Sequence, residues 1–257
     1  MALLVRTWNV FHGNAKPPER RAFLEEMVGL ASADRPQVLC LQEVPVWALR
    51  RLPDWTGMRV FGAVAARPLL GSPTLGGAIT ELHHGRLRSA LTGQANAILL
   101  GSDLRVLGSD SIVLNSRSFR RSEGRKLALD PKARWAWAKE RRVCQAVRAE
   151  AEGRPLVVAN MHTTSYVYRR LPDAELLRGA VFADAFAEPD DALVLAGDFN
   201  VVVGRSATLA QLTEPDWGFP EPIAGLDQIL ARGAEATRPE PWPEKRRRLD
   251  EIGRAHV

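Results

Sequence analysis

The run from Ala192 to Ala196 is wholly apolar, and it constrains the fold more than any other stretch of the sequence. Such a short run suits a buried strand and is too short for a typical helix. Gly197 ends it, and Asp198 and Asn200 follow two residues apart. Because alternate residues of a strand share a face, we expect both side chains to point the same way if the extended geometry persists. A carboxylate that takes a proton beside an amide that donates to an oxyanion suits hydrolysis, although the same residues are also typical of a plain turn.

Other short apolar runs predict further strands, and two longer stretches have the spacing of amphipathic helices. The first helix opens at Pro17 and continues to Ala31, and the second extends to Phe186 after Asp173, a candidate N-cap. Strands alternating with helices predict an α/β protein, and we expect one domain over residues 1–257 because no repeat or linker interrupts the pattern. The predicted strands are 3–10, 38–41, 76–82, 95–100, 143–147, 156–159, 192–196 and 225–230.

Composition fits an ordinary globular protein, with 46% apolar and 25% charged residues. The sequence has no apolar run long enough for a membrane span, and Leu3-Leu4-Val5 is too short for the core of a signal peptide. Cys40 and Cys144 lie in apolar runs, so we interpret them as buried free thiols in a reducing compartment. We therefore expect a cytoplasmic protein, and we expect it to be a monomer. The net charge of +5 suits an anionic partner, such as nucleic acid or a phosphorylated small molecule.

The polar residues of interest share one placement, because each follows, closes or interrupts an apolar strand. Functional sites are commonly assembled at strand ends, where the sheet holds the backbone rigid while the loops diverge. Glu43 is the candidate metal ligand, since Mg²⁺ takes one or two protein carboxylates and leaves its other positions to water and phosphate. His162 suits a phosphate contact or a general acid. The strand-end residues are Asn9, Glu43, His162, Asp198, Asn200 and Asp227.

Each of these residues also has a purely structural interpretation. Glu43 alone is better explained as a rim residue paired with an arginine, and a lone histidine is more often structural than catalytic. Asp227 is either a hairpin residue or a carboxylate that orients a histidine. Residues 115–139 are basic and irregular in pattern, and they include Trp135 and Trp137. They predict either a solvated loop or a surface that neutralises phosphates and stacks on bases, with similar weight.

Taken together, six short motifs resemble the ordered motifs of the endonuclease/exonuclease/phosphatase superfamily, which has the DNase I-like fold. The resemblance extends from residue 5 to about 230, and the ordered set is more specific than any one member. The motifs are Thr7-Trp8-Asn9, Leu41-Gln42-Glu43, Glu140-Arg141-Arg142, Asn160-Met161-His162, Gly197-Asp198-Phe199-Asn200 and Leu226-Asp227-Gln228.

This resemblance implies a four-layer α/β sandwich of two packed mixed β-sheets flanked by helices. It also implies phosphoester hydrolysis that depends on Mg²⁺, or alternatively Mn²⁺. By the match, Glu43 resembles the metal carboxylate and Asn9 its neighbour in the metal site. Asp198 resembles the residue that activates water, and Asn200 and His162 resemble phosphate and transition-state contacts. Asp227 resembles the partner of the family's last catalytic histidine.

The sequence departs from the family pattern at its end. The family closes with a Ser-Asp-His motif on a final strand, whereas here Arg248-Leu249-Asp250 is followed by Glu251 to Val257. His256 has no aspartate before it, so we do not assign it the catalytic role. The last seven residues resemble a translated sequencing adapter, and we expect the native C-terminal strand to be missing after about residue 250.

We therefore expect a divalent-metal-dependent phosphodiester hydrolase, most simply an endonuclease or exonuclease acting on nucleic acid. A phosphatase or phosphodiesterase acting on a small phosphoester or a lipid head group is the alternative with the same chemistry. An inactive binding scaffold is the alternative of another class, since the sequence lacks the Ser-Asp-His motif.

Overall fold

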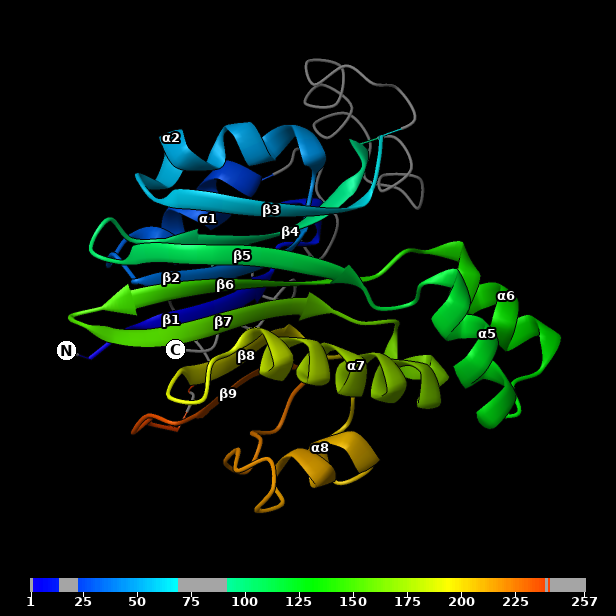
Figure 1. Ribbon diagram of the computed structural model, residues 1–257. Coiled ribbons are helices and arrows are strands. Elements are labelled where there is room, and N and C mark those ends of the chain that lie inside the picture. Colours follow the sequence, from blue (N-terminus) through cyan, green and yellow to red (C-terminus); the bar gives the residue numbers. More distant parts are fainter. Residues whose placement is uncertain (1, 14–22, 69–91, 239, 241–257) are drawn as a thin grey trace.

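The computed structural model describes residues 2–13, 23–68, 92–238 and 240, and contains two mixed β-sheets packed face to face (Figure 1). The first sheet has the order β1-β2-β4-β3, in which β1 and β2 are parallel and the other neighbours antiparallel. The second has the order β5-β6-β7-β8-β9, in which only β7 and β8 are parallel. The strands are β1 (Val5–Asn9), β2 (Val38–Val44), β3 (Arg59–Ala66), β4 (Gln94–Leu100), β5 (Arg105–Val113), β6 (Val143–Ala151), β7 (Arg154–His162), β8 (Ala192–Asp198) and β9 (Asp227–Arg232).

Helices cover the outer face of each sheet (Figure 1). Met27 of α1 and Leu52 of α2 pack on the first sheet, and Leu176 of α7 and Leu209 of α8 pack on the second. The predicted four-layer α/β sandwich with two mixed sheets is therefore confirmed. No helix in the described ranges is long and apolar enough to cross a membrane. The helices are α1 (Leu24–Ser32), α2 (Leu52–Thr56), α5 (Arg117–Lys126), α6 (Pro131–Lys139), α7 (Arg170–Phe186) and α8 (Ala207–Leu212), with 3₁₀ turns η1 (Phe11–Gly13), η2 (Val46–Arg50) and η3 (Tyr166–Tyr168).

A separate apolar cluster fills the space between the sheets, because alternate residues of a strand face opposite sides. In β2, Leu39 and Leu41 pack toward the helices, whereas Val38 and Cys40 join the cluster between the sheets. Cys40 and Cys144 are buried free thiols, as predicted. Burial raises the pKa of both thiols, so they remain protonated and unreactive.

Residues 115–139 form two helices, so the prediction of an irregular segment is wrong. α5 and α6 make a hairpin beyond the ends of β5 and β7 (Figure 1). Ser116 and Asp130 cap the two helices, each accepting the backbone N–H of the residue three positions later. Pro131 then occupies the first turn of α6, where its missing N–H costs nothing. Side-chain caps thus start both helices despite their low apolar content.

Two other expectations differ from the structure, and one lies outside the described residues. No strand is predicted at β3 or β5, where the structure has one each. The predicted strand 76–82 falls in the part of the chain that the structure does not describe. Asp173 does not cap α7, which begins at Arg170. Its carboxylate instead accepts hydrogen bonds from Ser206 Oγ and from the backbone N–H of Thr208, at 3.3 Å for the latter. Asp173 therefore joins α7 to the start of α8.

Candidate active site

The space between the sheets changes from apolar to polar toward one end of the sandwich. There Gln42 Nε2 donates to Asn160 Oδ1 at 2.8 Å and to Thr7 Oγ1 at 2.9 Å. Asn160, on the second sheet, donates to two backbone carbonyls of the first, Leu41 O at 3.0 Å and Ala97 O at 2.9 Å. Because Gln42 and Asn160 are fully buried, these bonds fix the sheets against each other. The strand ends just beyond this layer are held at a defined separation.

Three predicted residues meet at those strand ends. Asn9 closes β1, Glu43 lies near the end of β2, and Asp198 closes β8 on the opposite sheet. Asn9 Nδ2 donates to Glu43 Oε1 at 3.2 Å and to Asp198 Oδ2 at 2.9 Å. Asn9 Oδ1 accepts the backbone N–H of Phe11 at 3.0 Å. One amide therefore holds a carboxylate from each sheet in the same small space.

Glu43 reaches this position through an irregularity in β2. The pairing of β2 with β4 shifts register between Leu41 and Val44, and Glu43 has a φ of +53°, which is uncommon for any residue but glycine. Strict alternation would put Glu43 on the helix-covered face, opposite to Gln42. The bulge instead lets both side chains point between the sheets. Strained backbone of this kind is frequent at functional sites.

His162, the last residue of β7, completes the cluster. Its Nε2 lies 3.7 Å from Glu43 Oε1 and 3.7 Å from Asp198 Oδ2. On its other side, Arg142 Nη1 lies 3.0 Å from Nδ1 and 3.2 Å from Nε2, and Gln94 Nε2 lies 3.4 Å from Nδ1. Burial, the Arg142 guanidinium and His12 hold the pKa of His162 well below its ordinary value of 6.5. The ring is therefore neutral at physiological pH.

Asn200 and Asp227 adjoin Asp198 in different ways. The backbone N–H of Asn200 donates to Asp198 Oδ1 at 3.1 Å, and Asn200 Nδ2 donates to Thr163 O at 3.3 Å. Asn200 has a φ of +50°, so the extended geometry ends at Asp198. Asp227 pairs directly with Asp198 across β8 and β9 and is buried. Residues opposite each other on neighbouring strands share a face, so Asp227 adds a further carboxyl group to this end of the sheet.

Three site residues carry no predicted role: His12, Gln94 and Arg142. His12 Nε2 lies 3.8 Å from Glu43 Oε2, and His12 is buried in η1 just after β1. Arg142 falls within the motif Glu140-Arg141-Arg142, and its Nη2 donates to Glu140 Oε2 at 2.7 Å. The motif points to Arg142, but its contact with His162 depends on the pairing of β6 with β7, which no local pattern shows.

Both carboxylates of the cluster are harder to ionise than usual. Burial raises the pKa of Glu43 to about 7, and the charges of Asp198 and Glu140 add to this, while Arg142 and the hydrogen bond from Asn9 oppose it. Burial likewise raises the pKa of Asp198, against hydrogen bonds from Asn9 and Asn200. Two desolvated carboxyl groups this close favour a cation between them.

This arrangement predicts a pH-dependent cost in the metal-free protein. The pKa of Glu43 is about 7 when folded and 4.5 for an ordinary glutamate, so the folded state holds the proton more tightly. Stability is therefore lost as pH rises from 4.5 to about 7. Glu43→Gln removes this term, and in chelator at about pH 8 we expect the variant to be more stable by roughly 1–3 kcal/mol. Urea denaturation of both proteins from about pH 5 to 8 measures the free energy of unfolding. If that free energy changes with pH in parallel for the two proteins, the prediction is wrong.

Comparison with protein families identifies the chain. The pattern of the Endonuclease/Exonuclease/phosphatase family matches residues 7–250. The chain belongs to this family. The match includes every strand-end residue that the cluster brings together, and the resemblance of the six motifs is thereby confirmed. Comparison with curated protein sequences gives no match.

Solved structures of this family share the fold at low sequence identity. An endonuclease/exonuclease/phosphatase from Beutenbergia cavernae superposes with a TM-score of 0.64 at 17% identity, covering 99% of this chain and 70% of that one. A humanized D. rerio TDP2 gives 0.59 at 14% identity, with 99% and 96% coverage. The human Nocturnin catalytic domain, solved with a bound sulfate anion, gives 0.55 at 18% identity, with 98% and 93% coverage. These likenesses establish the DNase I-like sandwich.

The donor set of the cluster fits a hard divalent cation. Within the described residues, no group of three or more His, Cys, Asp or Glu side chains forms a metal-binding cluster. Mg²⁺ does not require one, because it typically binds one or two carboxylates and keeps several waters. Glu43 and Asp198 offer such carboxylate oxygens, and a cation would offset the free-energy cost of burying the two carboxylates together. Asn9 currently presents Nδ2 to them, so direct ligation by its oxygen requires the amide to turn.

Proposed function

We propose that this chain is a divalent-metal-dependent phosphodiester hydrolase that acts on nucleic acid. The observation that carries the proposal is the meeting of Asn9, Glu43, His162 and Asp198, from four strands of two sheets, in one buried polar cluster. Family membership supports the same class of chemistry, because the family comprises endonucleases, exonucleases and phosphatases. A monomeric, cytoplasmic protein is part of this proposal, and the two buried free thiols support the compartment.

We assign the cation, Mg²⁺ or the similar Mn²⁺, to Glu43, with Asn9 at its side. When bound, such an ion lowers the pKa of water and screens the phosphoryl oxygens. Asp198 orients and deprotonates the attacking water, for which its raised pKa makes it a stronger base than an ordinary aspartate. Asn9 keeps Asp198 at a fixed distance from Glu43 through its two hydrogen bonds.

The remaining residues contact the phosphoryl group or support those that do. His162 is neutral and fixed by Arg142, so its ring can donate one hydrogen bond to a phosphoryl oxygen without repelling a cation. Asn200 stabilises the charge that develops in the transition state. Asp227, which pairs with Asp198 across β8 and β9, is the carboxylate that orients a catalytic histidine. These assignments use the side chains of the cluster in the positions that the structure gives them.

A cavity beside Asn200 favours a nucleotide over a bare phosphoester. It has a volume of about 320 Å³ and adjoins η3 and the loop after β8. Tyr166, half exposed, offers a ring to a base, and Arg169 and Arg205 offer positive charge to neighbouring phosphates.

Chelation and a substrate panel test the proposal. We expect hydrolysis of single- and double-stranded oligonucleotides with Mg²⁺, none with a chelator, and recovery when the ion is restored in excess. Inositol phosphates and phospholipids in the same panel distinguish the alternative substrates. Preferred hydrolysis of those compounds would replace the nucleic-acid assignment, and no hydrolysis of any member by this chain would favour the inactive scaffold.

A further inference from the structure

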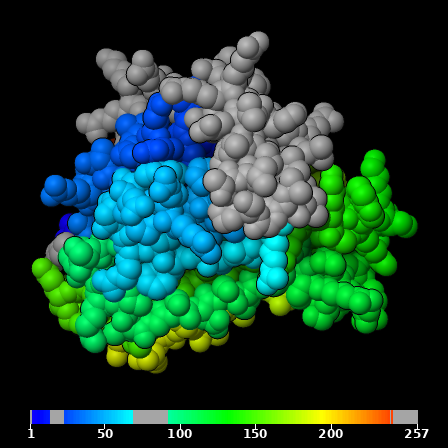
Figure 2. Space-filling view, turned by 90° about the horizontal axis from the view of Figure 1, so that it is seen from above, coloured from blue at the N-terminus to red at the C-terminus, as the bar shows by residue number. Residues whose placement is uncertain are grey.

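The positive charge of this protein is concentrated in the α5–α6 hairpin. Residues 117–139 contain eight Lys or Arg and two Asp or Glu, a net charge of +6, whereas the whole chain carries +5. The rest of the chain is therefore slightly negative. A basic segment of this strength creates a local attractive field for polyanions. The hairpin projects at one end of the molecule (Figure 2, green, right).

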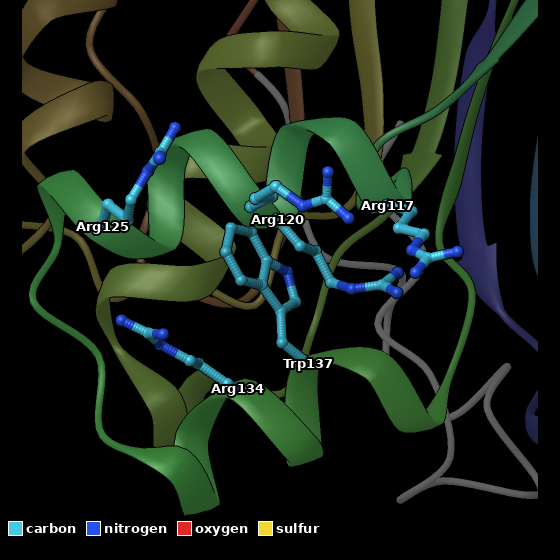
Figure 3. Close-up of a pocket in the computed structure, with 6 residues that line it drawn as sticks. Arg117, Arg120, Arg125, Arg134 and Trp137 are labelled. Atoms are coloured by element: carbon cyan, nitrogen blue, oxygen red, sulfur yellow. The ribbon is translucent and has the colours of Figure 1, made fainter.

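The arginines of the hairpin surround a defined hollow. A cavity of about 260 Å³ lies between α5 and α6, with arginines from both helices around it (Figure 3). Trp137 rises between the helices and forms its apolar wall, packed edge-on against Phe119 at 5.7 Å between ring centres. Trp137 is only 1% exposed, so it cannot stack on a base. The residues lining the cavity are Arg117, Arg120, Arg121, Arg125, Arg134 and Trp137.

These arginines have no acidic partners within the described residues. Arg120 donates to the backbone carbonyl of Asn115 and Arg134 to that of Gly124. The two acidic residues of the hairpin are otherwise engaged: Glu123 pairs with Lys126 at 2.9 Å, and Asp130 caps α6. Five arginines thus line one hollow without a neutralising carboxylate, and their like charges repel one another. A bound phosphate would remove that repulsion through charge-assisted hydrogen bonds.

The hairpin is held rigidly against the active site. Glu175 of α7 accepts hydrogen bonds from Trp137 Nε1 at 2.6 Å and from Thr164 N at 2.6 Å, and Thr164 lies two residues after His162. The hairpin also leads directly into Arg142, which contacts His162. Trp137 and Arg142 are five residues apart, so their Cα atoms are within roughly 18 Å of each other. A strand bound at the catalytic cluster can therefore reach the hollow within a few nucleotides.

We propose that the α5–α6 hollow is a second phosphate-binding subsite that holds the backbone of a nucleic-acid strand a few nucleotides from the scissile phosphate. This inference rests on the proposed function for the position of the scissile bond, but strand binding itself does not require catalysis. It makes the substrate a polymer rather than a mononucleotide. Backbone phosphates, not bases, are recognised there, so the subsite carries no sequence preference.

Binding measurements on the full chain in chelator test this subsite without hydrolysis. Arg121→Gln/Arg125→Gln removes two exposed charges that have no hydrogen bond in the described structure. Arg50→Gln/Arg51→Gln is the matched control, because it removes the same charge from an exposed turn outside the hairpin. The readout is fluorescence anisotropy of a labelled single strand of about 12 nucleotides and of a labelled dinucleotide, from low to moderate salt.

We expect the hairpin variant to bind the long strand about tenfold more weakly near 0.1 M salt, with a salt slope reduced by about 1.4. The control pair and the dinucleotide should change less than about twofold. Equal losses in both variants, or unchanged binding of the long strand, would overturn the subsite. Hydrolysis of a small phosphodiester by the wild type distinguishes failure of the subsite from failure of the proposed function. If the wild type hydrolyses that compound but replacing Arg121 and Arg125 does not change strand binding, only this inference fails. If strand binding depends on the pair but no substrate is cleaved, only the proposed function fails.

Discussion

Replacement of Asp198 by Asn is expected to lower kcat by about 10²- to 10⁴-fold, the usual contribution of a positioned general base. Asp198 is the buried carboxylate that both Asn9 Nδ2, at 2.9 Å, and the backbone N–H of Asn200, at 3.1 Å, orient. An asparagine has the same shape but cannot take a proton. One of those two hydrogen bonds is lost, because an amide has a single oxygen, which costs about 1 kcal/mol of stability.

Asp191→Asn is the matched control for this experiment. Asp191 immediately precedes β8 at the end opposite Asp198, is also buried, and accepts hydrogen bonds from Arg148 at 2.7 and 3.0 Å. Its variant should lower the melting temperature more than Asp198→Asn does, yet leave kcat within about threefold of wild type. Steady-state hydrolysis with saturating Mg²⁺ measures kcat for both variants, and thermal denaturation measures their melting temperatures. A kcat for Asp198→Asn within threefold of wild type would remove Asp198 from the mechanism.

The end of the sandwich at which the candidate site lies could be predicted from local sequence, because β7 and β8 are largely apolar and each ends in a polar residue. The last residue is His162 in β7 and Asp198 in β8, and apolar runs, Leu156 to Ala159 and Ala192 to Ala196, precede them. Their parallel pairing places those two residues side by side. A run that is apolar on both faces belongs to a strand covered on both sides, as the four-layer arrangement requires. The placement of polar residues at strand ends therefore predicts which side chains lie together before any contact is known.

The elements that sequence analysis misses are those whose conformation is decided by their neighbours. β5 is an edge strand with mostly exposed side chains, so Gly108, Ser109 and Asp110 resemble a loop when they are considered alone. The bulge that turns Glu43 into the site is likewise set by pairing with β4, not by the identity of Glu43. Caps at Ser116 and Asp130 are different, because both helices of the hairpin could have been predicted from them.

Gly197→Ala is expected to lower the free energy of unfolding by more than about 3 kcal/mol. Gly197 lies between the buried run of β8 and Asp198, with a φ of +135° that side-chain-bearing residues rarely adopt. A Cβ there would lie 2.0 Å from Met161 O and 3.0 Å from Met161 N, both backbone atoms of the neighbouring strand β7. Because both strands are buried and paired, neither can move aside without breaking the ladder that positions His162 and Asp198.

Gly204→Ala separates the two causes of the loss at Gly197, which are backbone strain and the clash of a Cβ with Met161. Gly204 also has a positive φ, +78°, but nothing lies within 4 Å of the position that an alanine methyl group would occupy there, so its replacement costs backbone strain alone, about 1 kcal/mol. Denaturant titration of both variants measures the difference. A loss at Gly197 no larger than that at Gly204 would mean that β7 and β8 separate easily at this end. If β7 and β8 hold together as the buried pairing implies, the close approach of Gly197 to Met161 is what sets His162 beside Asp198, and glycine is required there for the site as much as for the fold.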